Sequence, residues 1–224
     1  MPVSRSTHKS TRSSTKPSSR SSSKSRRTRM SAAERREQLL DVTLELICER
    51  GATNLSIDAI AKEAGITRPV VYSQFGDLPG LVHALIEREE KTVLGQLAKA
   101  IPHQVGQVEP DDVIVAAIES FFDAVQERPR TWQLVLTPPQ GMPSYVTDSF
   151  NERRESIIEQ ITPLIAWGVT KRGGPQGLDN GLLARVILVL AMEGGRLLIT
   201  DAEAYPRDLL VGQARALIGA LRTD

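Results

Sequence analysis

Cysteine, histidine and aromatic residues are all scarce in this chain of 224 residues, whose Phe, Trp and Tyr together make up 4%. The single cysteine, Cys48, cannot form a disulfide within the chain, and it lies among apolar residues of a helical pattern. We therefore expect a buried, unreactive thiol and a reducing compartment.

The three histidines, His8, His83 and His103, form no metal or nucleophile group, because only His83 and Glu87 share a helix face and two ligands are too few for a closed site. With no recognised glycine-rich phosphate loop either, we expect no enzyme, no cofactor and no metal.

Long uncharged apolar runs are also absent. The best candidate, Leu182 to Met192, is interrupted by Arg185, whereas a membrane-spanning helix needs about 20 apolar residues. The pair Arg26-Arg27 is followed by no apolar stretch of the kind an export signal requires. Hydrophobic residues still make up 40% of the chain, enough for one compact domain or two small ones. We expect a soluble protein that is not exported.

The net charge of +1 hides an uneven distribution. Residues 1–30 contain nine Lys or Arg and no acid, whereas residues 31–91 and 92–224 each carry a net charge of −4. The first segment is mostly Ser, Thr, Lys and Arg, so it is predicted to be a disordered basic tail. Such a tail can attract phosphates without regard to base sequence. There are two alternatives. The segment is a solubilising leader, or it is missing from the natural product because translation begins at Met30.

Apolar residues recur at spacings of three and four from Ser31 onward, and no strand-like alternation competes with them, so the fold class is predicted to be all-α. The first helix is expected between Ser31 and Gly51. The others are predicted at Ser56–Gly65, Thr67–Phe75, Asp77 towards Ala100, Asp111–Glu127, Thr131–Leu136, Ser144–Lys171 with a distortion at Pro163, Asn180–Thr200 and Arg207–Arg222.

The second and third predicted helices, joined at Gly65, form a helix-turn-helix. Ala61 and Ala64 are small enough to let the helices approach, and Gly65 can take the left-handed conformation that ends a helix before a tight turn. Val71 and Phe75 lie four residues apart and face inwards, which leaves the rest of the third helix exposed. Short helix-glycine-helix units also occur in ordinary helical proteins. The functional interpretation is that the third helix enters the major groove of DNA.

Side chains on the exposed side of the third helix suit contacts with DNA. Arg68 can bind the acceptor edge of guanine or a phosphate, Gln74 an adenine or a phosphate, and Val70 a thymine methyl group. Tyr72 can donate a hydrogen bond to a phosphate, and Pro69 fits the first helical turn. The predicted DNA-binding residues are Ser56, Thr67, Arg68, Pro69, Val70, Tyr72, Ser73 and Gln74, together with Arg26, Arg27 and Arg29 of the basic tail.

The segment from Ser31 to about Ile86 resembles the DNA-binding domain of the TetR (tetracycline-repressor) family. The resemblance rests on Gly51-Ala-Thr after the first helix, Ile60-Ala61-x-x-Ala64-Gly65-Ile66-Thr67, Tyr72-x-x-Phe75-Gly76-Asp77, and Leu81. It implies an N-terminal three-helix domain at 31–91, after the tail at 1–30, and a larger helical domain for effector binding and dimerisation at 92–224. One departure is that the family often has a lysine directly after the cap of the fourth helix, whereas this chain has Leu78, Pro79 and Gly80; we expect the basic tail to compensate.

The resemblance also implies a function. It points to a sequence-specific transcriptional regulator, by default a repressor, in the bacterial cytoplasm and associated with the nucleoid. The implied partners are a near-palindromic double-stranded DNA operator, a second copy of the chain in a homodimer, and an unknown small-molecule effector, with no membrane. The alternative is a sequence-tolerant architectural DNA-binding protein that uses the tail, although that role would not need a large acidic helical domain.

Bulky apolar residues are the candidates for an effector pocket, although such residues at helical spacing also form ordinary cores. They are Phe121, Phe122, Trp132, Met142, Tyr145, Phe150 and Trp167. The loop from Thr137 to Pro143 either borders the mouth of a pocket or simply connects two helices.

The last two predicted helices carry broad apolar stripes, and Gly194 and Gly195 allow close backbone approach. By the family layout these stripes would pair with a second subunit; alternatively they complete the core of the monomer. The predicted interface residues are Leu183, Val186, Ile187, Leu190, Gly194, Leu197, Leu210, Ala214, Leu217, Ile218 and Leu221.

Overall fold

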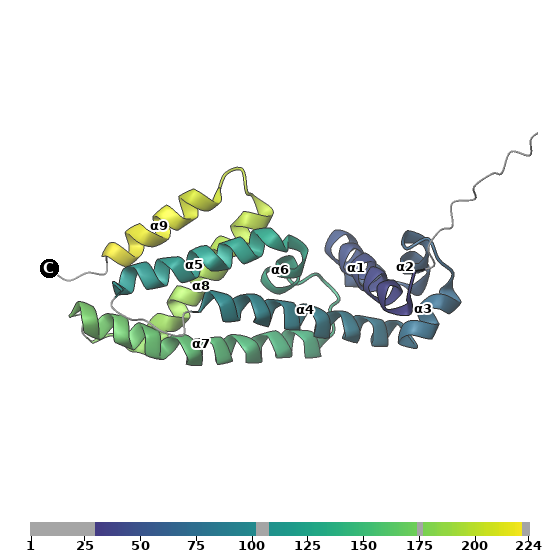
Figure 1. The fold of residues 1–224 in the computed structure, drawn as a ribbon, viewed down its shortest axis with the longest axis horizontal. Coiled ribbons are helices and arrows are strands. Elements are labelled where there is room, and N and C mark those ends of the chain that lie inside the picture. Colours follow the sequence, from purple (N-terminus) through teal and green to yellow (C-terminus); the bar gives the residue numbers. More distant parts are fainter. Residues whose placement is uncertain (1–29, 102–107, 174–176, 221–224) are drawn as a thin grey trace, which may run out of the picture. The chain divides into compact units, whose positions relative to one another are not determined.

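The computed structural model describes residues 30–101, 108–173 and 177–220, and in these ranges it contains helices and no strand, which confirms the all-α prediction. None of the described helices is both long and apolar enough to cross a lipid bilayer. The elements, shown in Figure 1, are α1 (Ala32–Arg50), the short 3-10 helix η1 (Ala52–Asn54), α2 (Ile57–Glu63), α3 (Arg68–Phe75), α4 (Leu78–Ala100), α5 (Pro110–Glu127), α6 (Pro129–Leu136), α7 (Ser144–Arg172), α8 (Asn180–Thr200) and α9 (Arg207–Ala220).

The observed helices begin and end within about two residues of the predicted bounds, and α7 continues through Pro163. The exception is η1, which was not predicted. Gly51 ends α1 with a φ of 76°, and the backbone N–H of Ala52 then donates to the carbonyl of Gln140, 3.1 Å away. This single turn depends on a segment almost ninety positions further along the chain, so local spacing does not reveal it.

Helix α1 contributes to two apolar clusters. On one side Leu39, fully buried, packs with Ile60 of α2 and Val71 of α3. On another side Leu44 packs with Leu85 of α4, in a cluster that also takes in residues of α6 and α7. Because the same helix completes both clusters, α2 and α3 are fixed to the other described helices through α1 and α4.

A third cluster is built from α5 to α9, with α5 and α8 packed together (Figure 1). Two glycines of α8 permit this packing. A Cβ atom at Gly194 would lie 2.7 Å from Cζ of Phe122, and one at Gly195 would lie 2.9 Å from Cζ of Phe121. Both distances are too short for real atoms, so the rings of α5 occupy the space that larger residues of α8 would need.

Helix α4 runs without a break through residue 91, where the predicted domain boundary lies. Residues from Ala32 onward cluster as one compact unit. The division into 31–91 and 92–224 therefore stays a prediction about function rather than a visible gap. Residues 1–29 of the predicted tail, including Arg26, Arg27 and Arg29, lie outside the described residues, as does Leu221.

Candidate functional site

The turn between α2 and α3 is built by its end residues. The Ser56 hydroxyl caps α2 by accepting the backbone N–H of Ala59 at 3.2 Å. Gly65 has a φ of 65°, as predicted for the residue that ends α2. Thr67 occupies the N-cap position of α3 without a side-chain cap bond, and this residue is exposed.

Helix α3 is held by α1 as well as by its own buried side. Val71 is fully buried, and the guanidinium of Arg36 lies 4.5 Å above the Phe75 ring while donating to the carbonyl of Gln74 at 3.2 Å. Gln38 donates to the carbonyl of Ala64 at 3.4 Å. Sequence reasoning missed Arg36 and Gln38, because nothing in the spacing of α1 marks two polar residues as positioning groups.

The opposite side of α3 is open. Arg68 and Tyr72 expose 63% and 50% of their surface, and Thr67 and Pro69 are also exposed. The Ser73 hydroxyl is exposed and donates to the carbonyl of Val70 at 2.8 Å. Val70, Gln74 and Ser56 are half-buried. The structure therefore brings the eight predicted residues that it describes onto α3 and the start of α2, with five of them well exposed.

One acidic residue stands directly beside this surface. The Arg68 guanidinium forms an ion pair with the carboxylate of Asp58 on α2, and both side chains are mostly exposed. The positive charge of Arg68 is therefore partly offset by a neighbouring acid. Asp58 was not among the predicted site residues, although its position on the exposed side of the second helix was readable from the spacing.

The start of α4 explains the sequence Leu78-Pro79-Gly80. Leu78 is half-buried and packs against both clusters that contain α1 residues. The N–H of Gly80 donates to the Asp77 side chain at 2.7 Å, and a Cβ at Gly80 would overlap the carbonyl oxygen of Phe75. Glycine thus allows α4 to start close against the end of α3, and the first turn of α4 presents backbone rather than a lysine.

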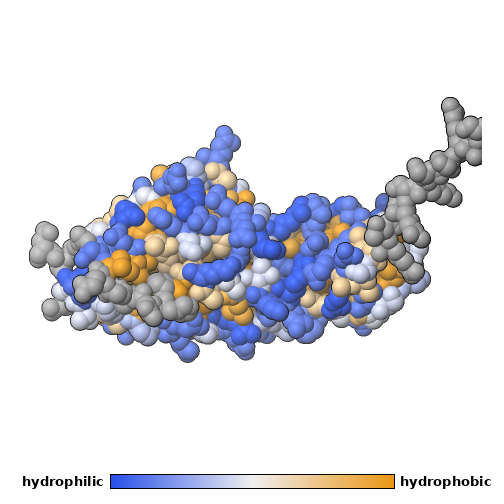
Figure 2. All heavy atoms as spheres, viewed as in Figure 1, coloured by the Kyte–Doolittle hydropathy of each residue, from blue (hydrophilic) through white to orange (hydrophobic). Residues whose placement is uncertain are grey.

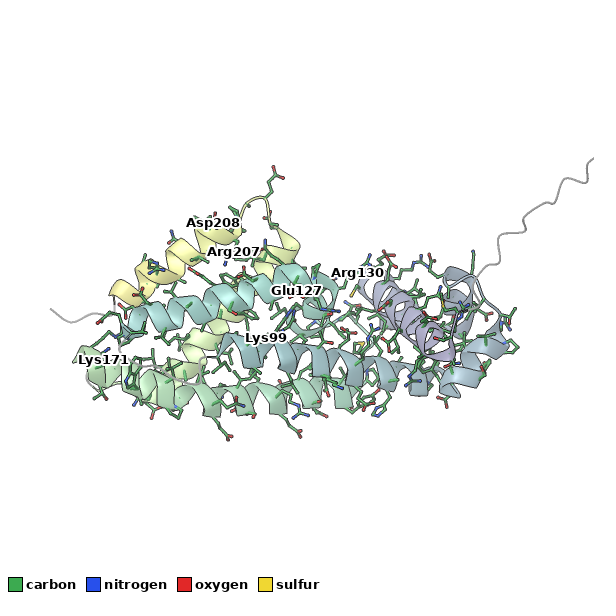
Figure 3. All side chains as sticks on the ribbon, viewed as in Figure 1. Lys99, Glu127, Arg130, Lys171, Arg207 and Asp208 are labelled. Atoms are coloured by element: carbon green, nitrogen blue, oxygen red, sulfur yellow. The ribbon has the colours of Figure 1, made fainter. Side chains whose placement is uncertain are left out.

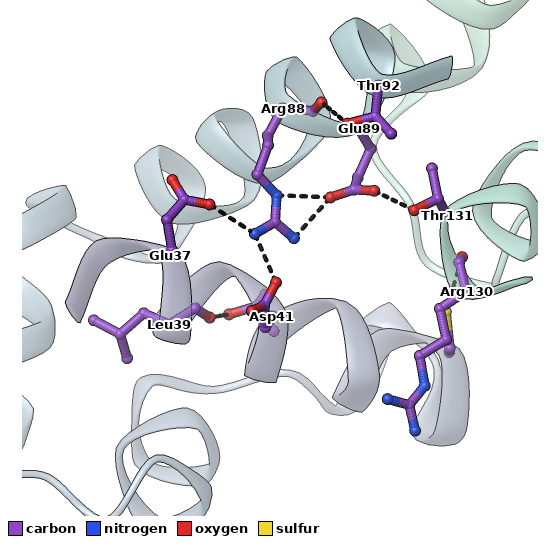
Figure 4. A network of polar contacts seen from close by, with 10 residues as sticks. Glu37, Leu39, Asp41, Arg88, Glu89, Thr92, Arg130 and Thr131 are labelled. Atoms are coloured by element: carbon purple, nitrogen blue, oxygen red, sulfur yellow. Dashed lines mark hydrogen bonds and ion pairs between the residues drawn. The ribbon is translucent and has the colours of Figure 1, made fainter. Parts of the chain in front are cut away.

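A polar network connects α1, α4 and α6 (Figure 4). Arg88 of α4 contacts Glu37 at 3.1 Å and Asp41 at 2.7 Å on α1, and its Nη2 lies 2.7 Å from the buried carboxylate of Glu89. The other oxygen of Glu89 accepts the hydroxyl of Thr131 on α6 at 2.6 Å. Burial alone would lower the pKa of Arg88, but Glu89 and the hydrogen bonds with Asp41 and Glu37 outweigh it and raise that pKa, so the guanidinium stays charged.

Helix α6 also touches α1 directly. Arg130 lies between the two helices (Figure 3) and pairs with Glu45 at 2.5 Å. The Cys48 thiol is 3.6 Å from the carbonyl of Arg130, and Gln133 donates to the carbonyl of Cys48 at 3.4 Å. Burial raises the pKa of Cys48 to about 11, with Arg130 opposing and Glu89 and Glu49 adding to the shift. The thiol is therefore a weak acid in a partly buried contact.

The loop from Thr137 to Pro143 docks against η1. Besides the bond from Ala52 to Gln140, Gly141 adopts a φ of 83°, and a Cβ there would lie 2.5 Å from Cγ2 of Thr53. The loop therefore does more than connect two helices. Pro138 at its beginning also borders a cavity, so one short segment touches both that cavity and the connection between α1 and α2.

That cavity, of about 330 Å³, lies among α4, α5, α6, α7 and α8. Of the seven predicted pocket residues, Phe121, Trp132 and Phe150 line it. The other four lie elsewhere: Phe122 packs on Gly194, Met142 packs in the cluster with Leu44, Tyr145 lies 6.2 Å from the His83 ring, and Trp167 lies under Lys171. No group of three or more metal-ligating side chains is found in the described residues.

The predicted interface residues of α8 and α9 that the structure describes divide into three sets. Leu183, Gly194 and Ile218 are buried within the chain itself. Val186, Leu190 and Leu217 expose 47%, 54% and 56% of their surface, and Leu182 and Val189 beside them are more than half exposed. The remaining residues are half-buried and border a smaller hollow of about 180 Å³ between α5, α8 and α9; they are Ile187, Leu197, Leu210 and Ala214. Ile187 lines the larger cavity as well.

Comparison with known proteins gives a consistent result. Residues 39–85 match the family model described as "Bacterial regulatory proteins, tetR family". The chain is 28% identical over 186 residues to the HTH-type transcriptional activator FasR of Mycolicibacterium smegmatis, covering 83% of this chain and 82% of that protein. It is also 28% identical to the HTH-type transcriptional repressor BepR of Brucella suis, covering 76% and 82%. A crystal structure of a TetR-like transcriptional regulator from Rhodococcus sp. RHA1 has the same fold, with a TM-score of 0.68, 23% identity and coverage of 84% and 94%.

Proposed function

The chain belongs to the tetR family of bacterial regulatory proteins, and from this premise we propose that it binds operator DNA as a homodimer and regulates transcription in response to a small molecule. The observation that carries the proposal is the placement of α3. Its buried side is fixed by Val71 and by Arg36, while its other side is open to solvent. A helix held in this way can enter the major groove without rearrangement.

The proposed DNA contacts divide by their chemistry. Arg68 and Gln74 can hydrogen-bond to base edges or phosphates, and Val70 can touch a thymine methyl group. Tyr72 and the hydroxyls of Thr67 and Ser73 are placed for phosphates. The first turn of α4 offers little to a phosphate, because Pro79 has no backbone N–H and the N–H groups of Gly80 and Leu81 donate to Asp77. Repression is the proposed outcome of binding, and it rests on resemblance alone, to repressors such as BepR.

The exposed apolar side of α8 and α9 supports the homodimer. Large apolar side chains at Val186, Leu190 and Leu217 are accessible although the same helices bury Leu183 and Ile218 in the chain itself. Contiguous exposed apolar surface of this kind marks an interaction site. In a twofold dimer each side would meet its own copy, which places two α3 helices for the two halves of a near-palindromic operator.

The cavity supports an effector site, and the polar network supports its link to DNA binding. Trp132 lines the cavity, and Thr131 beside it on α6 donates to Glu89. Glu89 in turn holds Arg88, which contacts α1. A ligand that displaces Trp132 would therefore change contacts that run to α1, and α1 holds α3. Regulation needs only that the ligand bind one arrangement of these helices more tightly than another.

Selection of randomised duplex DNA by the protein tests the function. The full chain and a version that begins at Met30 are each used at two salt concentrations. The expected result is one palindromic motif enriched by both forms, with the full chain gaining affinity that falls steeply with salt. Arg68→Ala should relax the preference at one position of the motif if Arg68 contacts a base, and weaken binding evenly if it contacts a phosphate. Enrichment of no motif by either form would overturn the proposed regulator in favour of an architectural DNA-binding protein.

A further inference from the structure

The lining of the cavity is apolar along most of its length. On α4 it extends from Glu90 to Ala100, a run of eleven residues that corresponds to about 16 Å of helix, and it includes Ile101 directly after the helix. On α7 it extends from Thr147 to Ile165. Towards the Ile101 end the lining consists of aliphatic side chains such as those of Leu97, Ile161 and Ile165. A largely apolar space that extends along two helices accepts an extended hydrocarbon better than a compact polar molecule.

Polar groups gather at the other end. Glu90, Thr147, Asn151, Arg153 and Arg154 all line the cavity, and Ser149 of α7 hydrogen-bonds to Glu90, which places the start of α7 beside the middle of α4. The lining therefore has a polar end near Glu90 and an apolar end near Ile101. A molecule that matches it has one polar head and one long apolar tail.

The charges at the polar end favour an anionic head. The Glu90 carboxylate already accepts a hydrogen bond from Ser149. Arg153 and Arg154, both exposed, make no ion pair within the part of the chain that the structure describes, and they outnumber the single acid of the lining. An arginine guanidinium has a planar fork of donors that matches the two oxygens of a carboxylate.

We propose that the cavity binds a single-chain amphiphile, whose aliphatic tail lies between α4 and α7 and whose carboxylate head is bound by Arg153 and Arg154. This inference rests on the proposed function, since it names the chemical class of the effector. Trp132, whose indole N–H donates to Gln96 at 2.9 Å, lies along the tail and would sense its arrival.

Three probes with the same alkyl chain and different heads provide the test: dodecanoate, dodecanol and dodecylamine, each below its aggregation concentration. Binding is measured by the fluorescence of Trp132 in a full-length Trp167→Phe variant, because the chain has two tryptophans and Trp167 lies outside the cavity. Dodecanoate should give a saturable change and bind at least about tenfold more tightly than dodecanol or dodecylamine.

Matched variants locate the tail and the head. Ala117→Phe fills the cavity and should abolish the fluorescence change, whereas Ala116→Phe, on the exposed neighbouring position of α5, should leave it intact. Exchange of both Arg153 and Arg154 for glutamine should reduce the affinity for dodecanoate to that for dodecanol, and leave the affinity for dodecanol unchanged. Arg128→Gln, an exposed arginine outside the lining, is the control.

Two results would overturn the inference. One is the absence of saturable binding for all three probes; the other is tighter binding of dodecylamine that is lost in Glu90→Gln. Either result in a protein that still selects a DNA motif rejects an amphiphile with a carboxylate head and leaves the proposed regulator standing. Saturable binding of dodecanoate by a protein that selects no motif would instead reject the DNA-binding function alone.

Discussion

Helices α1 to α3 and helices α5 to α9 bury their apolar residues to different degrees. In the first group Leu39, Ile60 and Val71 are fully enclosed, and among the exposed side chains of α2 and α3 only Tyr72 is large and partly apolar. The second group leaves a cavity of about 330 Å³ and exposes Val186, Leu190 and Leu217. In Figure 2 the surface around α1 is largely hydrophilic, whereas apolar residues reach the surface between α5 and α7.

The difference fits two kinds of partner. A closed core with a polar surface suits a polar partner such as DNA, because nothing in the core has to change when it binds. A core with a cavity and an exposed apolar side is incomplete without other molecules, and an apolar ligand or a second copy of the chain would cover what is left open. If this contrast holds, changes in the two regions should have effects of different size.

Two leucine truncations compare the cores directly. Leu81→Ala removes a side chain that is fully buried in the closed cluster, and should lower the free energy of unfolding by about 3 kcal/mol. Leu97→Ala enlarges a cavity that already exists, and should cost about 1 kcal/mol. Urea denaturation followed by circular dichroism measures both. Equal losses would mean that the two regions are packed equally well.

The exposed side of α8 is tested by a matched pair of valines. Val186→Glu, at 47% exposure, should weaken the dimer by about a hundredfold, because twofold symmetry places two new charges in one apolar interface. Val108→Glu, at 49% exposure and outside these helices, should leave the dimer unchanged. Analytical ultracentrifugation over a range of concentrations distinguishes the two. A dimer that survives Val186→Glu intact would place its interface elsewhere.

The ion pair beside α3 is tested by removing its acid. Asp58→Asn frees Arg68 and removes a negative charge near the phosphates, so DNA affinity should rise by about fivefold at low salt. Glu63→Gln, on the same helix in the longer contact with Arg50, should have little effect. Fluorescence anisotropy with the selected operator gives the dissociation constants. Weaker binding by Asp58→Asn would show that Asp58 positions Arg68 productively instead of competing for it.

The effect of the Cys48 titration appears only at alkaline pH. Its pKa is raised from 9.0 to about 11, because burial disfavours the thiolate. The folded state therefore prefers the neutral thiol, and this contribution to stability is present below pH 9 and is lost as the pH rises towards 11. At pH 8 the thiol should react with a disulfide reagent at least about tenfold more slowly in the folded chain than in urea. A folded rate equal to the rate in urea would contradict the shift, and Cys48→Ser should flatten the fall in stability above pH 9.

Periodicity was sufficient to predict the helices, because an amphipathic helix repeats its apolar residues whatever it packs against. The turn at Gly65 was predictable for the same local reason, since a left-handed residue between two short helices favours glycine. The side of α3 that stays exposed followed from Val71 and Phe75. Asp58 also borders that surface, and the spacing of the second helix was sufficient to predict its exposure.

Contacts between distant residues were beyond the sequence. Glu89 looks like any charged residue of a helix, yet it is buried because Arg88 and Thr131 satisfy its oxygens. The stripe on α8 is broad enough to face both inward and outward, so spacing does not separate Leu183 from Val186. The cavity is a gap left by five helices, and only their packing shows that Trp132 lines it whereas Trp167 does not.

The docked turn at Gly141 limits how the sequence of such a chain can diverge. Surface loops ordinarily accept insertions and deletions, because their ends alone are constrained. Here the middle of the loop is hydrogen-bonded to Ala52, and its glycine leaves no room beside Thr53. Side chains of the cavity can be exchanged one by one to suit a new molecule, but a change in loop length would shift the connection that leads into Ser56. We expect relatives with altered cavities to keep the length and the glycine of this loop.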